Sequence, residues 1–291
     1  MSGALVTAGM AIDEVTRPFG FAFFRDGLWV ATVAGALCGL IGVFVVLRSM
    51  SYIGHGLSHA IFGGFAVSAL AGVNVFIGAG VWGLASALAV SSVTRRRPIG
   101  SDAAIGVVTT ASFAFGLAIL QAGGGADVDA DAALFGNVLG VTREDVWIVT
   151  AVALFALAVV VLRYRTLLFV TFDAEVAEAS GVKVARVDGL LMLVLAASIL
   201  ATMNVMGVTL VAAAIVVPAV VARMITSSFP TMLWLSALIG AVCGFIGMNL
   251  SYHLDIASGP TIVLVGGVLF VLALSVTGMR GRRQLAQLQG G

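Results

Sequence analysis

Two histidines four positions apart are the side chains in this sequence best suited to chemistry. His55 and His59 enclose the segment HGLSH, at or within an apolar stretch. Residues with this spacing share one face of a helix, so both imidazoles can point at one ion. Imidazole binds zinc, manganese, iron, copper and nickel, and ionisable groups at membrane depth usually line a pathway or a polar cavity. Bonding to carbonyls at a helix mouth, or a proton relay, fits the same spacing.

A third polar side chain, Asn204, stands between two apolar runs in the segment TMNVMG at 202–207. Its carbonyl oxygen is a possible ligand for a cation. Capping of a helix end is the other interpretation of an asparagine at such a boundary.

Enzymatic chemistry is poorly supported by these residues. An intramembrane metalloprotease needs a glutamate base in a His-Glu-x-x-His arrangement, whereas residues 56–58 are Gly, Leu and Ser. The sequence also lacks a phosphate-binding loop of the form GxxxxGK[ST]. We therefore expect no catalytic residues and no permanently bound cofactor, and any ATP hydrolysis should occur on another chain.

The elements that carry these residues are predicted to be membrane helices. Of the 291 residues, 60% are hydrophobic and 10% are charged, and the mean hydropathy is +1.14, which excludes an ordinary soluble protein. A helix needs about 20 apolar residues to cross a bilayer. Nine stretches approach this length: 28–47, 55–72, 76–94, 103–121, 146–163, 188–203, 207–225, 231–250 and 261–279.

Such uninterrupted apolar runs predict an all-α polytopic membrane protein with eight or nine transmembrane helices. Nine spans place the N-terminus outside, and eight place it inside if the glycine-rich second stretch is broken. Lys and Arg concentrate in connections on one side of the predicted bundle, which we assign to the cytoplasm of a prokaryote. A net charge of +1 gives no reason to expect a nucleic-acid partner.

Paired glycines are spaced for close helix packing. Gly35 and Gly39 in the first stretch, and Gly240 and Gly244 in the eighth, each form a small-xxx-small pattern. Tight packing of the bundle is the expected result.

The longest polar interruption of the second half contains the segment TFDAEVAEASG at 171–181. Acidic side chains favour the first and middle turns of a helix here, and a glycine favours its end. We predict a short cytoplasmic helix with a small apolar face, suited to docking into a groove on a partner. Its candidate coupling residues are Phe172, Asp173, Glu175, Glu178 and Gly181.

The predicted organisation has three parts. Residues 1–27 form an N-terminal segment, 28–279 form a single transmembrane domain with the cytoplasmic helix at about 171–182, and 280–291 form a cytoplasmic tail.

Ordered motifs along nearly the whole chain resemble the permeases of zinc, manganese and iron ABC importers. The motifs are MSYIGHGLSHA at 50–60, DAAIGV at 102–107, LFGNVLGVT at 134–142, FDAE and the following residues at 172–181, VTLVAAAIVVPA at 208–219 and SYHLD at 251–255.

The resemblance implies a permease homodimer that works with a cytoplasmic ATPase dimer and an extracytoplasmic metal-binding protein. It implies that residues 173–181 form the coupling helix that enters the ATPase. It also implies that His59 handles the metal, with Asn204 facing the pathway. The family usually has an aspartate where this chain has His55, and a pair of imidazoles is a softer donor set that favours zinc over manganese. A proton-coupled secondary metal transporter is the alternative.

Overall fold

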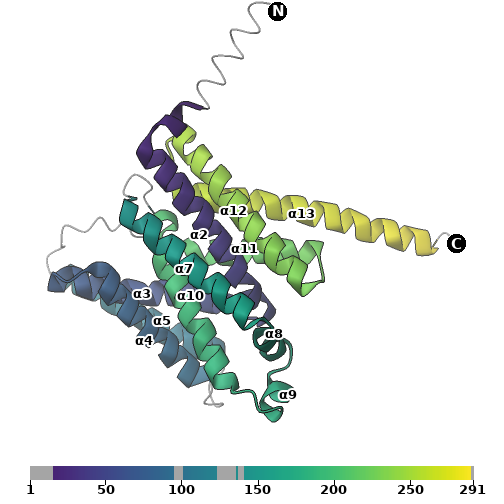
Figure 1. The fold of residues 1–291 in the computed structure, drawn as a ribbon, viewed down its shortest axis with the longest axis horizontal. Coiled ribbons are helices and arrows are strands. Elements are labelled where there is room, and N and C mark those ends of the chain that lie inside the picture. The colour runs from purple at the N-terminus through teal and green to yellow at the C-terminus, as the bar shows by residue number, and fades with distance from the viewer. Residues whose placement is uncertain (1–15, 95–100, 123–135, 137–140, 290–291) are drawn as a thin grey trace, which may run out of the picture.

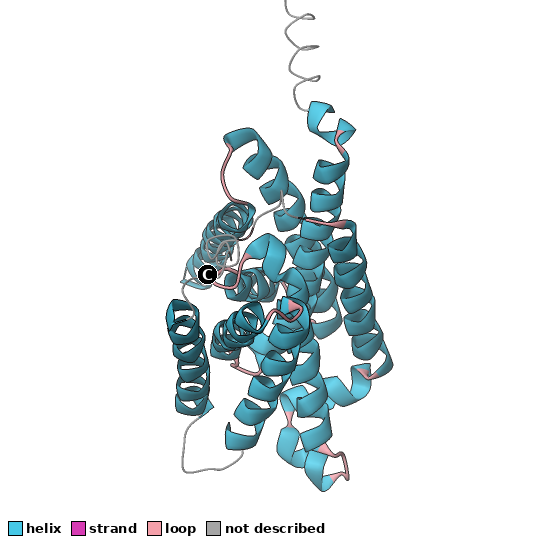
Figure 2. Cartoon of the chain, turned by 90° about the vertical axis from the view of Figure 1, so that its left-hand side faces the viewer, coloured by secondary structure: helices cyan, strands magenta, loops and turns pink. Residues whose placement is uncertain are grey.

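The computed structural model describes residues 16–94, 101–122, 136 and 141–289, and every regular element in these residues is helical (Figures 1 and 2). The order is η1 (Arg17–Gly20), α2 (Ala22–Leu47), α3 (Ser51–Ala71), α4 (Val75–Thr94), α5 (Ser101–Ala122), α7 (Arg143–Leu162), α8 (Tyr164–Phe172), α9 (Ala174–Ala179), α10 (Val184–Met206), α11 (Val211–Ile225), α12 (Phe229–Leu254) and α13 (Ser258–Gln289).

Each of the nine predicted apolar stretches forms a helix, which confirms the all-α prediction. Six of the described helices are long and apolar enough to cross a membrane: α2, α5, α7, α10, α12 and α13. The apolar parts of α3, α4 and α11 are shorter. The glycine-rich second stretch lies in one unbroken helix, α3. Two boundaries differ from the sequence prediction: α2 starts at Ala22 instead of 28, and α13 continues through 280–289.

The small-residue patterns bring α2 and α12 together as antiparallel neighbours (Figure 1). A methyl group added to Gly35 would overlap the carbonyl oxygen of Gly240, and the reverse holds equally. One turn along α2, the Ser236 hydroxyl donates a hydrogen bond of 2.6 Å to the carbonyl of Gly39. The predicted close packing is confirmed, and it depends on the absence of side chains at these positions.

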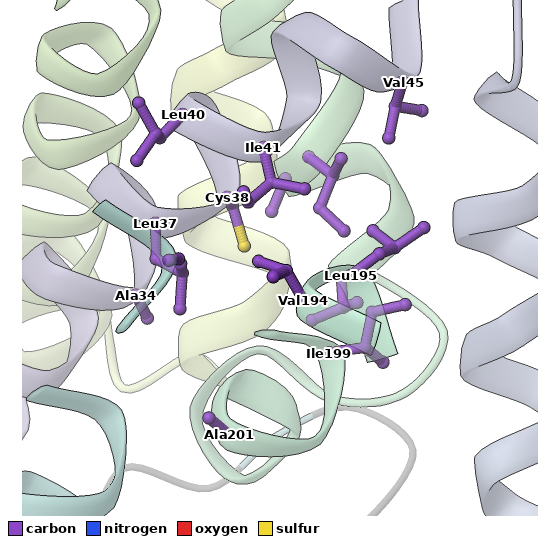
Figure 3. Close-up of a cluster of buried hydrophobic side chains, with 14 of the residues drawn as sticks. Ala34, Leu37, Cys38, Leu40, Ile41, Val45, Val194, Leu195, Ile199 and Ala201 are labelled. Atoms are coloured by element: carbon purple, nitrogen blue, oxygen red, sulfur yellow. The ribbon is translucent and has the colours of Figure 1, made fainter. Parts of the chain in front are cut away.

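The other side of α2 packs on α10 through a continuous apolar layer (Figure 3). Cys38 lies in this layer, with Leu37 and Ile41 of α2 on one side and Val194 and Ile199 of α10 on the other. The thiol is buried and free, so it acts as a small apolar packing group.

The helices share a common pair of ends. Near the starts of α2 and α7, Trp29 Nε1 donates to Thr150 Oγ1 at 3.1 Å, so these helices run parallel, whereas α12 runs in the opposite direction. The start of α2 therefore lies at the opposite end of the bundle from α8 and α9 (Figure 1).

Charge differs between these two ends. The end that carries α8 and α9 is rich in cations: Arg48, Arg163, Arg165, Lys183, Arg186 and Arg223. Among the described residues this end also carries the acids Asp173, Glu175, Glu178 and Asp188, whereas the opposite end has half as many cations, Arg17, Arg25 and Arg143, with the acids Asp26, Glu144, Asp145 and Asp255. The positive-inside rule assigns the α8–α9 end to the cytoplasm and the start of α2 to the outside.

Candidate metal path and cytoplasmic elbow

His59 lies within the first half of α3, on the side that packs against α5. Its ring meets that of Phe113 edge to face, with 4.7 Å between the ring centroids. The side chain is partly buried, while Ser58 beside it is fully buried. A partly buried imidazole inside an apolar helix bundle is a group that can exchange contacts with a passing cation.

His55 and Asn204, the other predicted ligands, are placed only by their backbones. His55 is one helical turn before His59 in α3, as the spacing predicts, and Asn204 lies in the last turn of α10. The two helices touch. The side chains of His55 and Asn204 are outside the described part of the structure. Among the side chains that are described, no group of three or more His, Cys, Asp or Glu is close enough to hold a metal ion.

The predicted helix at 171–181 is divided into two elements. Thr171 and Phe172 end α8, and Asp173 leaves the helical conformation with φ −151° and ψ 88°. Its carboxylate then accepts a hydrogen bond of 2.9 Å from the backbone N–H of Val176, which caps the start of α9. The single helix predicted at about 171–182 is therefore wrong in extent, because Asp173 is a cap and not a helical residue. We refer to α8, α9 and the bend at Asp173 as the elbow.

The end of α9 follows the prediction closely. Gly181 has φ +88°, a conformation that side chains disfavour. The N–H of Val182 bonds to the carbonyl of Ala177 at 3.0 Å, and that of Gly181 bonds to Glu178 at 2.9 Å. This pair of bonds is a Schellman motif, which stops the helix and turns the chain toward α10.

The exposed surface of the elbow has both apolar and acidic groups. Phe172 is 64% exposed and Val176 is 50% exposed, whereas Ala177 between the two ends of α9 is fully buried against the protein. Glu175 and Glu178 are also exposed. The six-residue helix is thus held at both ends and presents apolar side chains outward, which is the kind of surface that can contact a partner.

Arg48 attaches the elbow to the bundle. At the end of α2 its Nη1 atom forms an ion pair of 2.7 Å with Asp188 Oδ1 of α10, and its Nε atom donates to Thr171 Oγ1 of α8 at 3.2 Å. The side chain of Arg48 is only 9% exposed and that of Asp188 is 30% exposed. We name this three-residue contact the Arg48 clamp. It joins the segments on both sides of α9 to the central helix of the bundle.

A ring cluster supports the same region. Phe229, the first residue of α12, is 8% exposed and contacts Phe44 of α2, Tyr164 of α8 and Phe172 of α8. The centroid distances are 5.7, 5.7 and 5.9 Å respectively. These rings come from three helices, so the elbow is packed against both α2 and α12.

The Arg48 clamp and the Phe229 cluster were not found from the sequence. Arg48 and Asp188 are 140 residues apart, and no local pattern pairs charges at that separation. The available signal was weaker: Arg48 is a single cation directly after a long apolar run.

Comparison with known proteins gives a consistent result. Residues 20–277 match the family model described as ABC 3 transport family. A manganese transport system membrane protein, MntC, of Halalkalibacterium halodurans is 37% identical over 261 residues, covering 90% of this chain and 89% of the relative. A chelated iron transport system membrane protein, YfeD, of Yersinia pestis is 32% identical over 269 residues, covering 91% and 89%.

Solved structures show the same fold. PsaBC from Streptococcus pneumoniae, determined in complex with a Fab, matches with a TM-score of 0.81 at 32% identity, covering 90% of this chain and 95% of that one. An inward-facing putative metal-chelate type ABC transporter matches with a TM-score of 0.70 at 15% identity, over 86% and 85% of the two chains. The second likeness concerns the fold alone.

Proposed function

Since this chain belongs to the ABC 3 transport family, we propose that it carries manganese(II), or the chemically similar ferrous ion, along a path that passes His59. The chain is a multi-pass permease subunit of a bacterial ABC importer and lies in the plasma membrane. The family match over residues 20–277 is the observation that carries this assignment. No finding supports the proton-coupled carrier.

Manganese is preferred to zinc because of the relatives. The two named above are a manganese and an iron protein, and the softness of two imidazoles is a weaker argument than this. The order of affinities of divalent metals is nearly the same in most protein sites, so two imidazoles alone do not select zinc. The geometry of the site and the supply of each metal decide which ion is carried.

ATP hydrolysis is assigned to a separate cytoplasmic ATPase dimer. The sequence has no phosphate-binding loop of its own. The elbow supplies a rigid, exposed contact at the cytoplasmic end, and α9 is proposed to enter the ATPase as the coupling helix. A second copy of this chain and an extracytoplasmic metal-binding protein complete the proposed importer.

The Arg48 clamp gives this coupling a physical route. When two ATPases close on ATP, each α9 moves with them, and Thr171 and Asp188 on its two sides are both tied to Arg48. Movement of α9 is therefore transmitted to α2, which packs on α12, α11 and α10. Alternating access follows if these helices switch between two packed arrangements.

Metal passage needs ligands that bind briefly. A closed tetrahedral cage would hold the ion, whereas two imidazoles on one face of α3, with water or Asn204, leave coordination positions open. In this proposal His59 is a direct ligand, and His55, one turn earlier in α3, supplies the second imidazole.

Replacement of both histidines tests the metal path. The double variant H55A/H59A should assemble in the membrane but lose more than about nine-tenths of metal uptake, measured as accumulation of radioactive manganese. H253A is the matched control, because His253 is exposed at the end of α12, where its ring meets that of Tyr252. Normal uptake by the double variant would remove the pair from the path.

A further inference from the structure

A basic cavity lies beside the elbow, and none of the residues of the proposed metal path lines it. It has a volume of about 280 Å³ and is formed where the end of α7, α8, the segment after α9 and the start of α10 meet. Three cations, Arg163, Lys183 and Arg186, line it together with the hydroxyl-bearing Thr166. Its remaining walls are the aliphatic side chains of Leu167, Val182, Val187 and Leu190.

Among the described residues, no carboxylate lies within 4.0 Å of the three cations. None of them forms an ion pair with a described carboxylate, and all three side chains are exposed. Asp188, two residues after Arg186, forms its ion pair with Arg48 at 2.7 Å. Three positive charges around one cavity attract an anion, and solvent screens this attraction in part because the side chains are exposed.

A second hollow adjoins the first and is apolar on one side. It has a volume of about 580 Å³ and is lined by Val161, Leu162, Tyr164, Arg165 and Thr166, so Thr166 belongs to both. Val161 is 57% exposed and Leu162 is 80% exposed at the last turn of α7, a helix that can span the membrane. The cations thus lie next to an exposed apolar surface at the cytoplasmic end of a helix that can span the membrane.

We propose that this cavity binds the headgroup of an anionic phospholipid of the inner leaflet. The phosphate would lie among Arg163, Lys183 and Arg186, and the acyl chains would follow Val161 and Leu162 along α7. A free phosphate ion would use the cations but not the exposed aliphatic edge, so the lipid is the ligand that fits both parts.

The position of the site suggests what the lipid does. Arg163 precedes the elbow and Lys183 follows it, so one headgroup bridges the two segments that hold α9. A bound lipid should therefore stiffen the elbow. This consequence rests on the proposed coupling function, whereas the lipid site itself does not.

Lipid selectivity of the full-length chain tests the proposal. The protein is placed in nanodiscs of phosphatidylcholine with phosphatidylglycerol, and the lipids it retains are counted by native mass spectrometry. Each Lys or Arg near a membrane surface contributes on the order of one kcal/mol to anionic-lipid attraction, so loss of three should lower phosphatidylglycerol selectivity by roughly 100-fold. The variant is R163Q/K183Q/R186Q.

The control has the same charge change at the opposite end of the bundle. R17Q/R25Q/R143Q should keep the selectivity of the natural chain, and the single variants K183Q and R186Q should show graded losses even if the triple variant fails to fold. Three outcomes would overturn the proposal: unchanged selectivity in the triple and single variants, equal loss in the control, or retention of inorganic phosphate with no preference for phosphatidylglycerol over phosphatidylcholine. Transport need not be measured, so this result is independent of the metal path.

Discussion

Arg48 places a positive charge at the inner end of a nearly all-apolar helix, where a charge is expensive unless it is paired. Its pair with Asp188 at 2.7 Å and its bond to Thr171 at 3.2 Å supply that pairing. Since Asp188 keeps 30% exposure, water screens it in part, and the contact is worth less than a fully buried pair. The contribution of the Arg48 clamp is structural, because it joins α2, α8 and α10 at one point.

Replacing Arg48 with glutamine should loosen the elbow. The change leaves Asp188 without its cation and should cost about 1–3 kcal/mol, as expected when a hydrogen bond to a charged group is lost. A lower midpoint of thermal unfolding in detergent would show this. In the reconstituted complex, metal-stimulated ATP hydrolysis should fall further than basal hydrolysis does.

R143Q is the matched control for this prediction. Arg143 is 84% exposed and reaches Asp26 only at 4.0 Å, so its loss should change stability by less than about 0.5 kcal/mol. Equal effects of R48Q and R143Q on both measurements would contradict the role given to the Arg48 clamp.

At the scale of elements, the contact between α2 and α12 depends on side chains that are absent. Gly35 and Gly240 face each other so closely that a methyl group on either would overlap backbone of the other helix. Backbone cannot move aside as a flexible side chain can, so the helices would have to separate.

Alanine at Gly35 or Gly240 should therefore lower the yield of folded protein and the midpoint of thermal unfolding. G267A is the control, because a methyl group at Gly267 in α13 meets nothing within 4 Å. There the better helix propensity of alanine should leave stability unchanged or raise it by up to about 1 kcal/mol. Destabilisation by G267A comparable to that by G240A would refute the packing argument.

The elbow is the other element with a specific expectation. Replacing the exposed apolar side chain of Val176 with a charged one should weaken the proposed contact with an ATPase, so V176D should lose most co-purification with the ATPase while folding normally. Val73, which is 54% exposed in the connection between α3 and α4, provides a comparable position at the other end of the molecule. V73D should co-purify as the natural chain does, and retention of the ATPase by V176D would argue against docking through α9.

The sequence allowed the elements to be predicted better than their joints. Apolar runs of about 20 residues are strong local signals, and all nine predicted stretches are helical. Asp173 shows the limit of this prediction. An aspartate is common both as a cap and in the first turn of a helix, so the sequence pattern did not separate α8 from α9. The Arg48 clamp and the Phe229 cluster depend on how helices pack, and a single sequence does not contain that information in any local pattern.

At the scale of the whole molecule, a helix bundle connects the two regions to which we assign different functions. His55 and His59 lie within α3, and the elbow lies at the cytoplasmic end, linked to the central helix α2 through Arg48 and Phe229. The His59 environment was only partly predictable, because spacing placed both histidines on one face of α3 but gave no indication of Phe113 as the neighbouring ring. In the proposed importer, metal movement at the one region and ATP hydrolysis next to the other would be coupled through the bundle.

Transport by the complex in proteoliposomes tests that coupling most directly. The chain is reconstituted with its ATPase, and manganese-loaded binding protein is supplied on the outer side. Uptake is followed with and without ATP inside the vesicles, and with and without an imposed proton gradient. The account predicts manganese uptake only when ATP, the ATPase and the loaded binding protein are all present. Uptake by the permease alone, driven by the proton gradient, would contradict it.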